Sequence, residues 1–127
     1  MRVLIVHTNE FMRRVLSRYV SRHLPGVTVV IAHTQAEAVA EMEKGACDIA
    51  LLADVAWRRH DREDPVKADY NLRFLLDREG FPTKIIALDS KIDWFSETLR
   101  ELANAVCRVD RLATELPEAF KRIGAPN

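Results

Sequence analysis

Four titratable side chains lie where apolar runs of the chain end, and their types could support metal or ligand binding. These residues are His7, Asp54, Asp89 and Asp110. If the runs form parallel neighbouring strands, their carboxyl ends share one edge of a sheet, where open α/β sheets bind ligands. An imidazole among carboxylates can hold a divalent cation. The pattern therefore raises one hypothesis, a small-molecule or metal-ion sensor at this edge.

The same acids also have a structural interpretation. Asp89 precedes an expected helix and is a suitable helix cap. Asp54 can pair with Arg58 or Arg59, and Asp110 can pair with Arg111 or stay solvated. A cap or an exposed ion pair satisfies a carboxylate without any ligand. This interpretation is the simpler one, so we do not predict a metal site.

Strand-like and helix-like patterns alternate along the chain. Apolar runs predict strands at Arg2–Val6, Val27–Ala32, Ile49–Leu52, Lys84–Leu88 and Val106–Val109. Periodicity and capping signals predict five helices. The first is Glu10–Leu24, the second runs from Gln35 to about Gly45, and the third ends over Leu72–Glu79. The fourth runs from Ser90 to about Ala103, and the fifth begins after Thr114. Apolar residues at consecutive strand positions are typical of a sheet covered on both faces. With right-handed crossovers we expect an α/β fold: a (βα)5 doubly wound, parallel, five-stranded sheet of order 2-1-3-4-5, flavodoxin-like.

Capping residues predict where several helices begin. Thr8 or Asn9 is a suitable N-cap for the first helix, and Thr34 with Glu37 forms a capping box for the second. Thr114 is the expected cap of the last helix, with Pro117 in its first turn, where a missing N–H costs little.

Composition limits the function classes. The 127 residues suit one domain spanning 1–127, with 48% hydrophobic and 30% charged residues. A formal net charge of zero argues against nucleic-acid binding, although Arg14, Arg18 and Arg22 form a stripe on the first helix. We expect no membrane segment, reduced and buried Cys47 and Cys107, and a cytoplasmic location.

Enzyme signatures are missing from the sequence. It contains no G-x-S-x-G nucleophile elbow, no G-x-G-x-x-G turn and no Walker A phosphate loop. We therefore expect no catalytic residues and no cofactor.

Four segments carry a resemblance to a known family: RVLIVHTNEFMRRVLSRYV, CDIALLAD, FPTKIIALDS and NAVCRVDRL. Over its whole length the chain resembles the receiver domain of bacterial response regulators. That family implies an acidic pair after the first strand, a phosphorylated Asp ending the third, Ser or Thr after the fourth and Lys after the fifth. The carboxylates hold Mg²⁺, which neutralises the phosphoryl group.

The chain departs from that pattern at every position. His7 and Thr8 stand at the acidic pair, Ala53 at the phosphoacceptor, Asp89 at the Ser/Thr and Asp110 at the Lys. An Asp repels a phosphoryl group where a Lys would bind it. Asp54 is one residue late, and a one-residue shift along a strand points a side chain to the opposite face. The resemblance therefore implies a degenerate pseudo-receiver, a phosphorylation-independent protein–protein interaction module in bacterial signal transduction or transcription regulation.

Receivers commonly contact partners through helix four, strand five and helix five, so the resemblance implies a protein partner or a homodimer through that face. The candidate interface residues are Trp57, Trp94, Phe95, Arg108 and Arg111. Trp57 lies in a long charged loop and could anchor a partner or fold back over the degenerate pocket. Trp94 and Phe95 cannot both face a core, so one of the two aromatic rings is expected at the surface.

Overall fold

The computed structural model describes residues 1–45, 47–53, 83–90, 101 and 103–124. Its strands are β1 (Arg2–Val6), β2 (Thr28–Ala32), β3 (Ile49–Ala53), β4 (Lys84–Asp89) and β5 (Ala105–Arg108). Its helices are α1 (Glu10–His23), α2 (Gln35–Lys44), the short 3₁₀ helix η2 (Val109–Arg111) and α5 (Leu112–Arg122).

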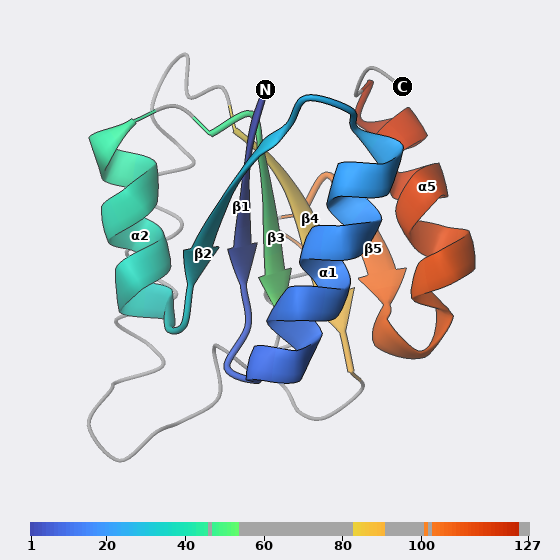
Figure 1. The fold of residues 1–127 in the computed structure, drawn as a ribbon, viewed down its shortest axis with the longest axis horizontal. Helices are drawn as coiled ribbons and strands as arrows, with labels where there is room; N and C mark the ends of the chain where they lie inside the picture. The colour runs from blue at the N-terminus through green and yellow to red at the C-terminus, as the bar shows by residue number, and fades with distance from the viewer. Residues whose placement is uncertain (46, 54–82, 91–100, 102, 125–127) are drawn as a thin grey trace.

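The strands form one parallel sheet in the order β2-β1-β3-β4-β5 (Figure 1). This order confirms the predicted doubly wound, flavodoxin-like fold. The register aligns Val6 with Leu52, Ala53 with Leu88, and Asp89 with Arg108. Because all strands point the same way, their last residues lie along a single edge of the sheet.

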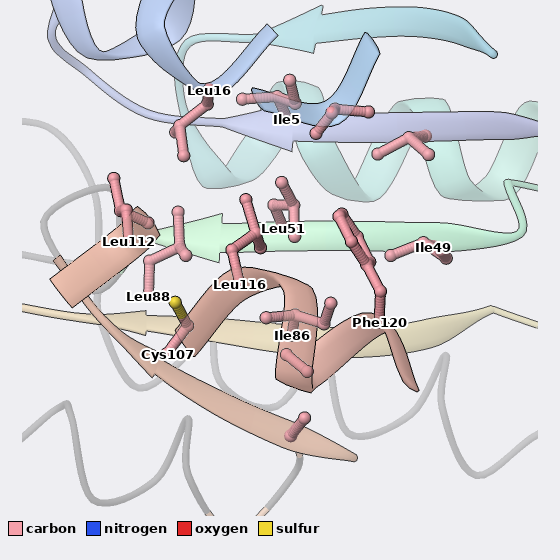
Figure 2. Close-up of a cluster of buried hydrophobic side chains, with 14 of the residues drawn as sticks. Ile5, Leu16, Ile49, Leu51, Ile86, Leu88, Cys107, Leu112, Leu116 and Phe120 are labelled. Carbon is pink, nitrogen blue, oxygen red and sulfur yellow. The ribbon is translucent and has the colours of Figure 1, made fainter. Parts of the chain in front are cut away.

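Both faces of the sheet are covered, which explains the uninterrupted apolar strands. One buried cluster joins the sheet to α2: Leu4, Val6, Ala32, Ala38, Met42, Cys47, Ala50, Leu52, Ile85 and Ala87. The other joins it to α1 and α5: Val3, Ile5, Leu16, Val20, Leu24, Ile49, Leu51, Ala53, Ile86, Leu88, Ala105, Cys107, Leu112, Leu116, Ala119 and Phe120 (Figure 2). All five residues of β3 are buried because both clusters include it.

The first two helices begin as their sequences predict. The Oδ1 atom of Asn9 accepts the Met12 N–H at 3.0 Å, so Asn9 is the N-cap of α1. The Oγ1 atom of Thr34 accepts the Glu37 N–H at 3.2 Å, and the Glu37 carboxylate accepts the His33 N–H at 2.6 Å. Both side chains thus satisfy backbone donors that a helix start leaves free.

The prediction for the last helix was wrong at its start. α5 begins at Leu112, its N-cap Arg111 makes no side-chain capping bond, and Thr114 lies inside it. Pro117 consequently falls in the second turn. Leu112 and Leu116 are buried against the sheet, and η2 leads directly into α5. Tertiary packing therefore determined the boundary in place of the local capping signal.

Two expected helices fall largely or wholly on residues that the structure does not describe. They are the one ending over Leu72–Glu79 and the one from Ser90 to about Ala103. Within the described ranges, no helix has the length and apolar character needed to cross a membrane.

We predict that Phe120→Ala destabilises the protein by roughly 3–5 kcal/mol, because it leaves a cavity in the cluster beneath α5. The Phe120 ring is 1% exposed. Phe11 on α1 is 71% exposed, so Phe11→Ala is the matched control, with an expected change below roughly 0.5 kcal/mol. Urea unfolding followed by circular dichroism measures both variants. Equal effects of the two substitutions would contradict the packing described for α5.

Candidate functional site

The carboxyl edge of the sheet brings the ends of β1, β3, β4 and β5 together. His7 directly follows β1, Ala53 and Asp89 are the last residues of β3 and β4, and Arg108 is the last residue of β5. The parallel register sets Ala53 beside Leu88, and Asp89 beside Arg108 on the next strand. Of the four residues predicted at this edge, His7, Asp89 and Asp110 end or follow described strands, and Asp54 lies outside the described residues.

His7 is buried, with 6% of its surface exposed, and it connects β1 to α1. Its Nδ1 atom accepts the Asn9 N–H at 3.0 Å, and its backbone oxygen accepts a bond from Arg13 Nη1 at 2.9 Å. Its own N–H donates to the Ala32 oxygen at 3.3 Å. An Nδ1 that accepts a backbone N–H carries no proton, so the ring proton of the neutral imidazole is on Nε2. These bonds give His7 a structural role at the strand–helix junction, while Thr8 is exposed.

Ala53 lies at the end of β3 and is completely buried in the cluster with α1 and α5. Its methyl group has no atom that could accept a phosphoryl group or bind a cation. Asp54, the next residue, lies outside the described residues.

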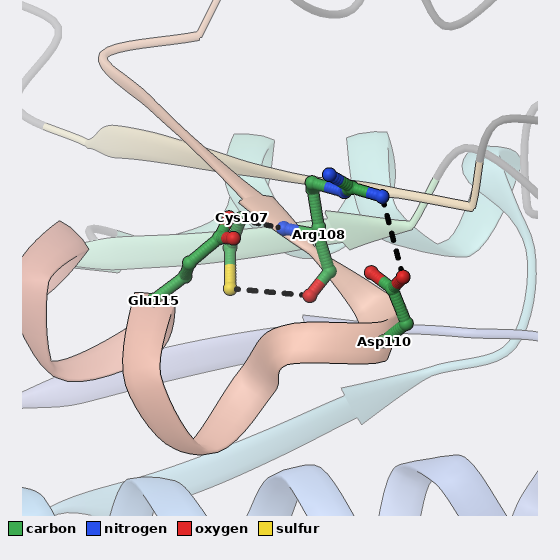
Figure 3. Close-up of polar contacts among 4 residues, drawn as sticks. All are labelled: Cys107, Arg108, Asp110 and Glu115. Atoms are coloured by element: carbon green, nitrogen blue, oxygen red, sulfur yellow. Dashed lines mark hydrogen bonds and ion pairs between the residues drawn. The ribbon is translucent and has the colours of Figure 1, made fainter.

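Asp89 is buried, with 6% of its surface exposed, whereas the Asp110 side chain is 65% exposed. Asp110 lies two residues beyond β5, in η2. Its Oδ2 atom pairs with Arg108 Nη2 at 3.3 Å (Figure 3). The partner of Asp110 is therefore Arg108 and not the expected Arg111, because η2 turns its carboxylate back toward the strand, while the side chain stays largely exposed to solvent, as the other expectation had it.

Arg108 places a positive charge at the sheet edge. From the sequence, we had expected this residue at an outer interface. Its backbone N–H donates to Glu115 Oε1 at 2.9 Å, and its guanidinium pairs with Asp110 (Figure 3). Its Nε atom is buried and has no hydrogen-bond acceptor within the described part of the chain. The sequence predicted the strand to end at Val109, whereas β5 ends at Arg108, so the place of this side chain at the strand end was not predicted. Arg111 is exposed, as expected of an interface residue.

The edge residues do not form a metal-binding cluster within the described ranges. Across those residues, no group of three or more His, Cys, Asp or Glu side chains is arranged to hold a metal ion. The aromatic interface candidates Trp57, Trp94 and Phe95 lie outside the described residues.

Both cysteines are buried free thiols, as predicted. Burial, and secondly the charge of Glu115, raise the pKa of the Cys107 thiol from 9.0 to about 12. Burial is also the main cause that raises the pKa of the Cys47 thiol. Both thiols therefore stay protonated at neutral pH and are poor nucleophiles.

No family model and no curated protein sequence matches the chain. Among solved structures, it is similar to the signal receiver domain of a DNA-binding response regulator from Colwellia psychrerythraea. That likeness has a TM-score of 0.74 and 13% identity, and it covers 97% of each chain. The response regulator TrrA from Thermotoga maritima, crystallised with Mg²⁺ and BeF, matches with a TM-score of 0.71 and 19% identity over 96% of this chain and 97% of that one.

A CheY-like receiver domain from Methanospirillum hungatei matches with a TM-score of 0.68 and 17% identity, over 97% of this chain and 94% of that one. At these identities the likeness establishes the fold. The chain has the receiver-domain fold of response regulators, which are proteins of two-component signal transduction.

We predict that Cys107 makes the protein less stable as pH rises from 9 toward 12. Below pH 9 the thiol is protonated in both states. Above it the unfolded thiol ionises while the folded one keeps its proton, so unfolding becomes more favourable.

The measurement is the free energy of unfolding of the wild type minus that of Cys107→Ala, determined at several pH values. Taking this difference removes the contribution of the other groups that titrate in the same range. The difference should decline steadily above pH 9. A difference that stays constant from pH 8 to 11 would show that Cys107 is not protonated as described.

Proposed function

We propose that this chain is a pseudo-receiver, a single domain of residues 1–127 that acts without aspartyl phosphate as a protein–protein interaction module in bacterial signal transduction or transcription regulation. The observation that carries the proposal is the chemistry of the sheet edge. A methyl group ends β3, where a receiver of the resembled pattern has its phosphoacceptor, and that methyl group is fully buried.

The neighbouring positions support the same conclusion. A phosphoryl group needs a cation beside it, and carboxylates are the ligands that hold Mg²⁺. Here His7 binds the backbone of Asn9 through Nδ1, and Thr8 has no carboxylate. Asp110 adds negative charge where the family pattern has Lys, and it is already paired with Arg108.

The bonds of these residues also weigh against the rival sensor hypothesis. A metal or small-molecule site would need several donors directed at one point. The Nδ1 of His7 is already engaged with a backbone N–H, and the carboxylate of Asp110 is turned to Arg108. Contacts within the protein thus account for the Nδ1 atom of His7 and for the Asp110 carboxylate.

Without a phosphoryl group, any change of state must come from a partner that binds two conformations with different affinity. The proposed contact surface is formed by β5, α5 and the helix expected from Ser90 to about Ala103. Arg108 is held by Glu115 and Asp110, so the exposed Arg111 is the better candidate for a direct contact. Trp94 and Phe95 on the expected helix remain candidate partner contacts.

We predict that incubation with acetyl phosphate and Mg²⁺ adds no phosphate to the chain, as measured by intact mass spectrometry. Beryllofluoride with Mg²⁺ should likewise leave the melting temperature unchanged, because a ligand that binds the native state must raise it. TrrA from Thermotoga maritima is the positive control, since it was crystallised with Mg²⁺ and BeF.

A phosphate adduct on any aspartate would overturn the proposal. The Asp54→Asn variant then identifies the site, because Asp54 is the carboxylate nearest in sequence to the resembled phosphoacceptor position. Loss of the adduct in this variant would assign a working, displaced phosphorylation site to the chain.

A further inference from the structure

Strand β2 is an edge of the sheet, and its outer side carries backbone groups that bond to no described residue. It pairs with β1 on one side, and no described strand lies beyond it (Figure 1). An edge strand presents a row of N–H and C=O groups on which another strand can form.

The hydrogen bonds with β1 identify which groups face outward. The Thr28 N–H donates to the Met1 oxygen at 2.9 Å, and the Ala32 oxygen accepts from the His7 N–H at 3.3 Å. Because alternate residues of a strand direct their N–H and C=O to the same neighbour, Thr28, Val30 and Ala32 face β1. Val29 and Ile31 therefore direct their backbone groups away from the sheet.

Nothing in the described part of the chain covers these outward groups. Neither Val29 nor Ile31 makes a backbone hydrogen bond outside the strand ladder with a described residue. The strand sequence TVVIA has no charge and no proline, the features by which proteins commonly protect an edge. Ile31 is also 39% exposed, one of three large hydrophobic residues exposed to this degree among the described residues.

The opposite edge of the sheet is protected in a way that β2 is not. At β5 the Arg108 N–H is bonded to the Glu115 carboxylate of α5, and the Arg108 guanidinium adds charge (Figure 3). A carboxylate bound to the backbone and a charged side chain both oppose strand addition. The two edges are thus chemically different, and among the described strands β2 is the edge suited to pair with another strand.

We propose that β2 is a self-association edge, on which the β2 strand of a second copy of this chain pairs in antiparallel orientation. A two-fold axis at Val30 sets Val29 opposite Ile31 of the second copy, and Ile31 opposite its Val29. These are the residues with outward backbone groups, so each pair exchanges two N–H···O bonds. The two sheets then become continuous.

The side chains of two copies also fit this register, and this fit is the reason to propose a second copy of the chain as the partner. Val29 and Ile31 lie level with Val3 and Ile5 on the α1 side of the sheet, and Val30 packs with the α2 cluster. Pairing sets apolar side chains across the junction on both faces and covers the exposed Ile31. The strand pair is short, so the dimer depends on protein concentration and is not permanent.

The test is sedimentation velocity of the whole chain over a series from micromolar to near-millimolar protein. We expect the wild type to pass from monomer to dimer. Ile31→Lys puts a charge on the edge and should weaken dimerisation by roughly ten-fold or more, with the fold confirmed by circular dichroism. Ala113→Lys is the matched control, since it adds the same charge at an exposed position of α5 and should leave the dimer intact.

Hydrogen exchange provides a second measurement that a folding defect cannot mimic. The amides of Val29 and Ile31 should exchange more slowly as wild-type concentration rises, while those of Thr28 and Val30, already in the ladder with β1, should not change. A wild type that stays monomeric throughout overturns the proposal. The proposal is also overturned if Ala113→Lys abolishes dimerisation and Ile31→Lys does not, because self-association then belongs to the α5 face. Neither result bears on the proposed phosphate-independent function.

Discussion

The burial of β3 on both faces is the constraint on which the rest of the structure depends. Ile49, Leu51 and Ala53 pack toward α1 and α5, while Ala50 and Leu52 pack toward α2. A strand with no solvent face must lie in the interior of a sheet between two helical layers. All the strands of the sheet are parallel, so they are joined by crossover connections and their carboxyl ends lie at one edge. The position of the candidate site at this edge is thus a consequence of how the core is packed.

The same burial leaves Ala53, the last residue of β3, without any group that could take part in chemistry at this edge. Ala53 belongs to the hydrophobic core, and the nearby polar residues complete backbone bonds within the protein. His7 accepts an N–H at the start of α1, and Arg108 ties β5 to η2 and α5 through Asp110 and Glu115. In a phosphorylated receiver these positions would be held ready for a metal and a phosphoryl group. Here the bonds of His7 and Arg108 hold the helices that follow β1 and β5 in place, and the function that we propose lies at the outer surfaces.

The two edges of the sheet differ as possible contact surfaces. One edge of the sheet is closed by an arginine and a carboxylate, whereas the other offers apolar side chains and backbone groups without partners among the described residues. This asymmetry underlies the two contacts that we propose, strand pairing at β2 and side-chain contact near α5. If the chain works without a covalent switch, as we propose, only differential binding of a partner can shift its conformational equilibrium.

The sequence alone determined the strands, the order of the sheet and the starts of α1 and α2. These depend on short-range properties: the apolar runs, the helical periodicity, and caps such as Asn9 and Thr34 that bond within three residues. Only the tertiary structure decided where α5 begins and what Arg108 does. The position of Leu112 is fixed by packing on the sheet, and the Arg108 backbone is bonded by a side chain seven residues later. Such contacts depend on the path of the chain through η2, which no local pattern encodes. Thr114 therefore does not cap α5, and the bonds of Arg108 to Asp110 and Glu115 could not be predicted.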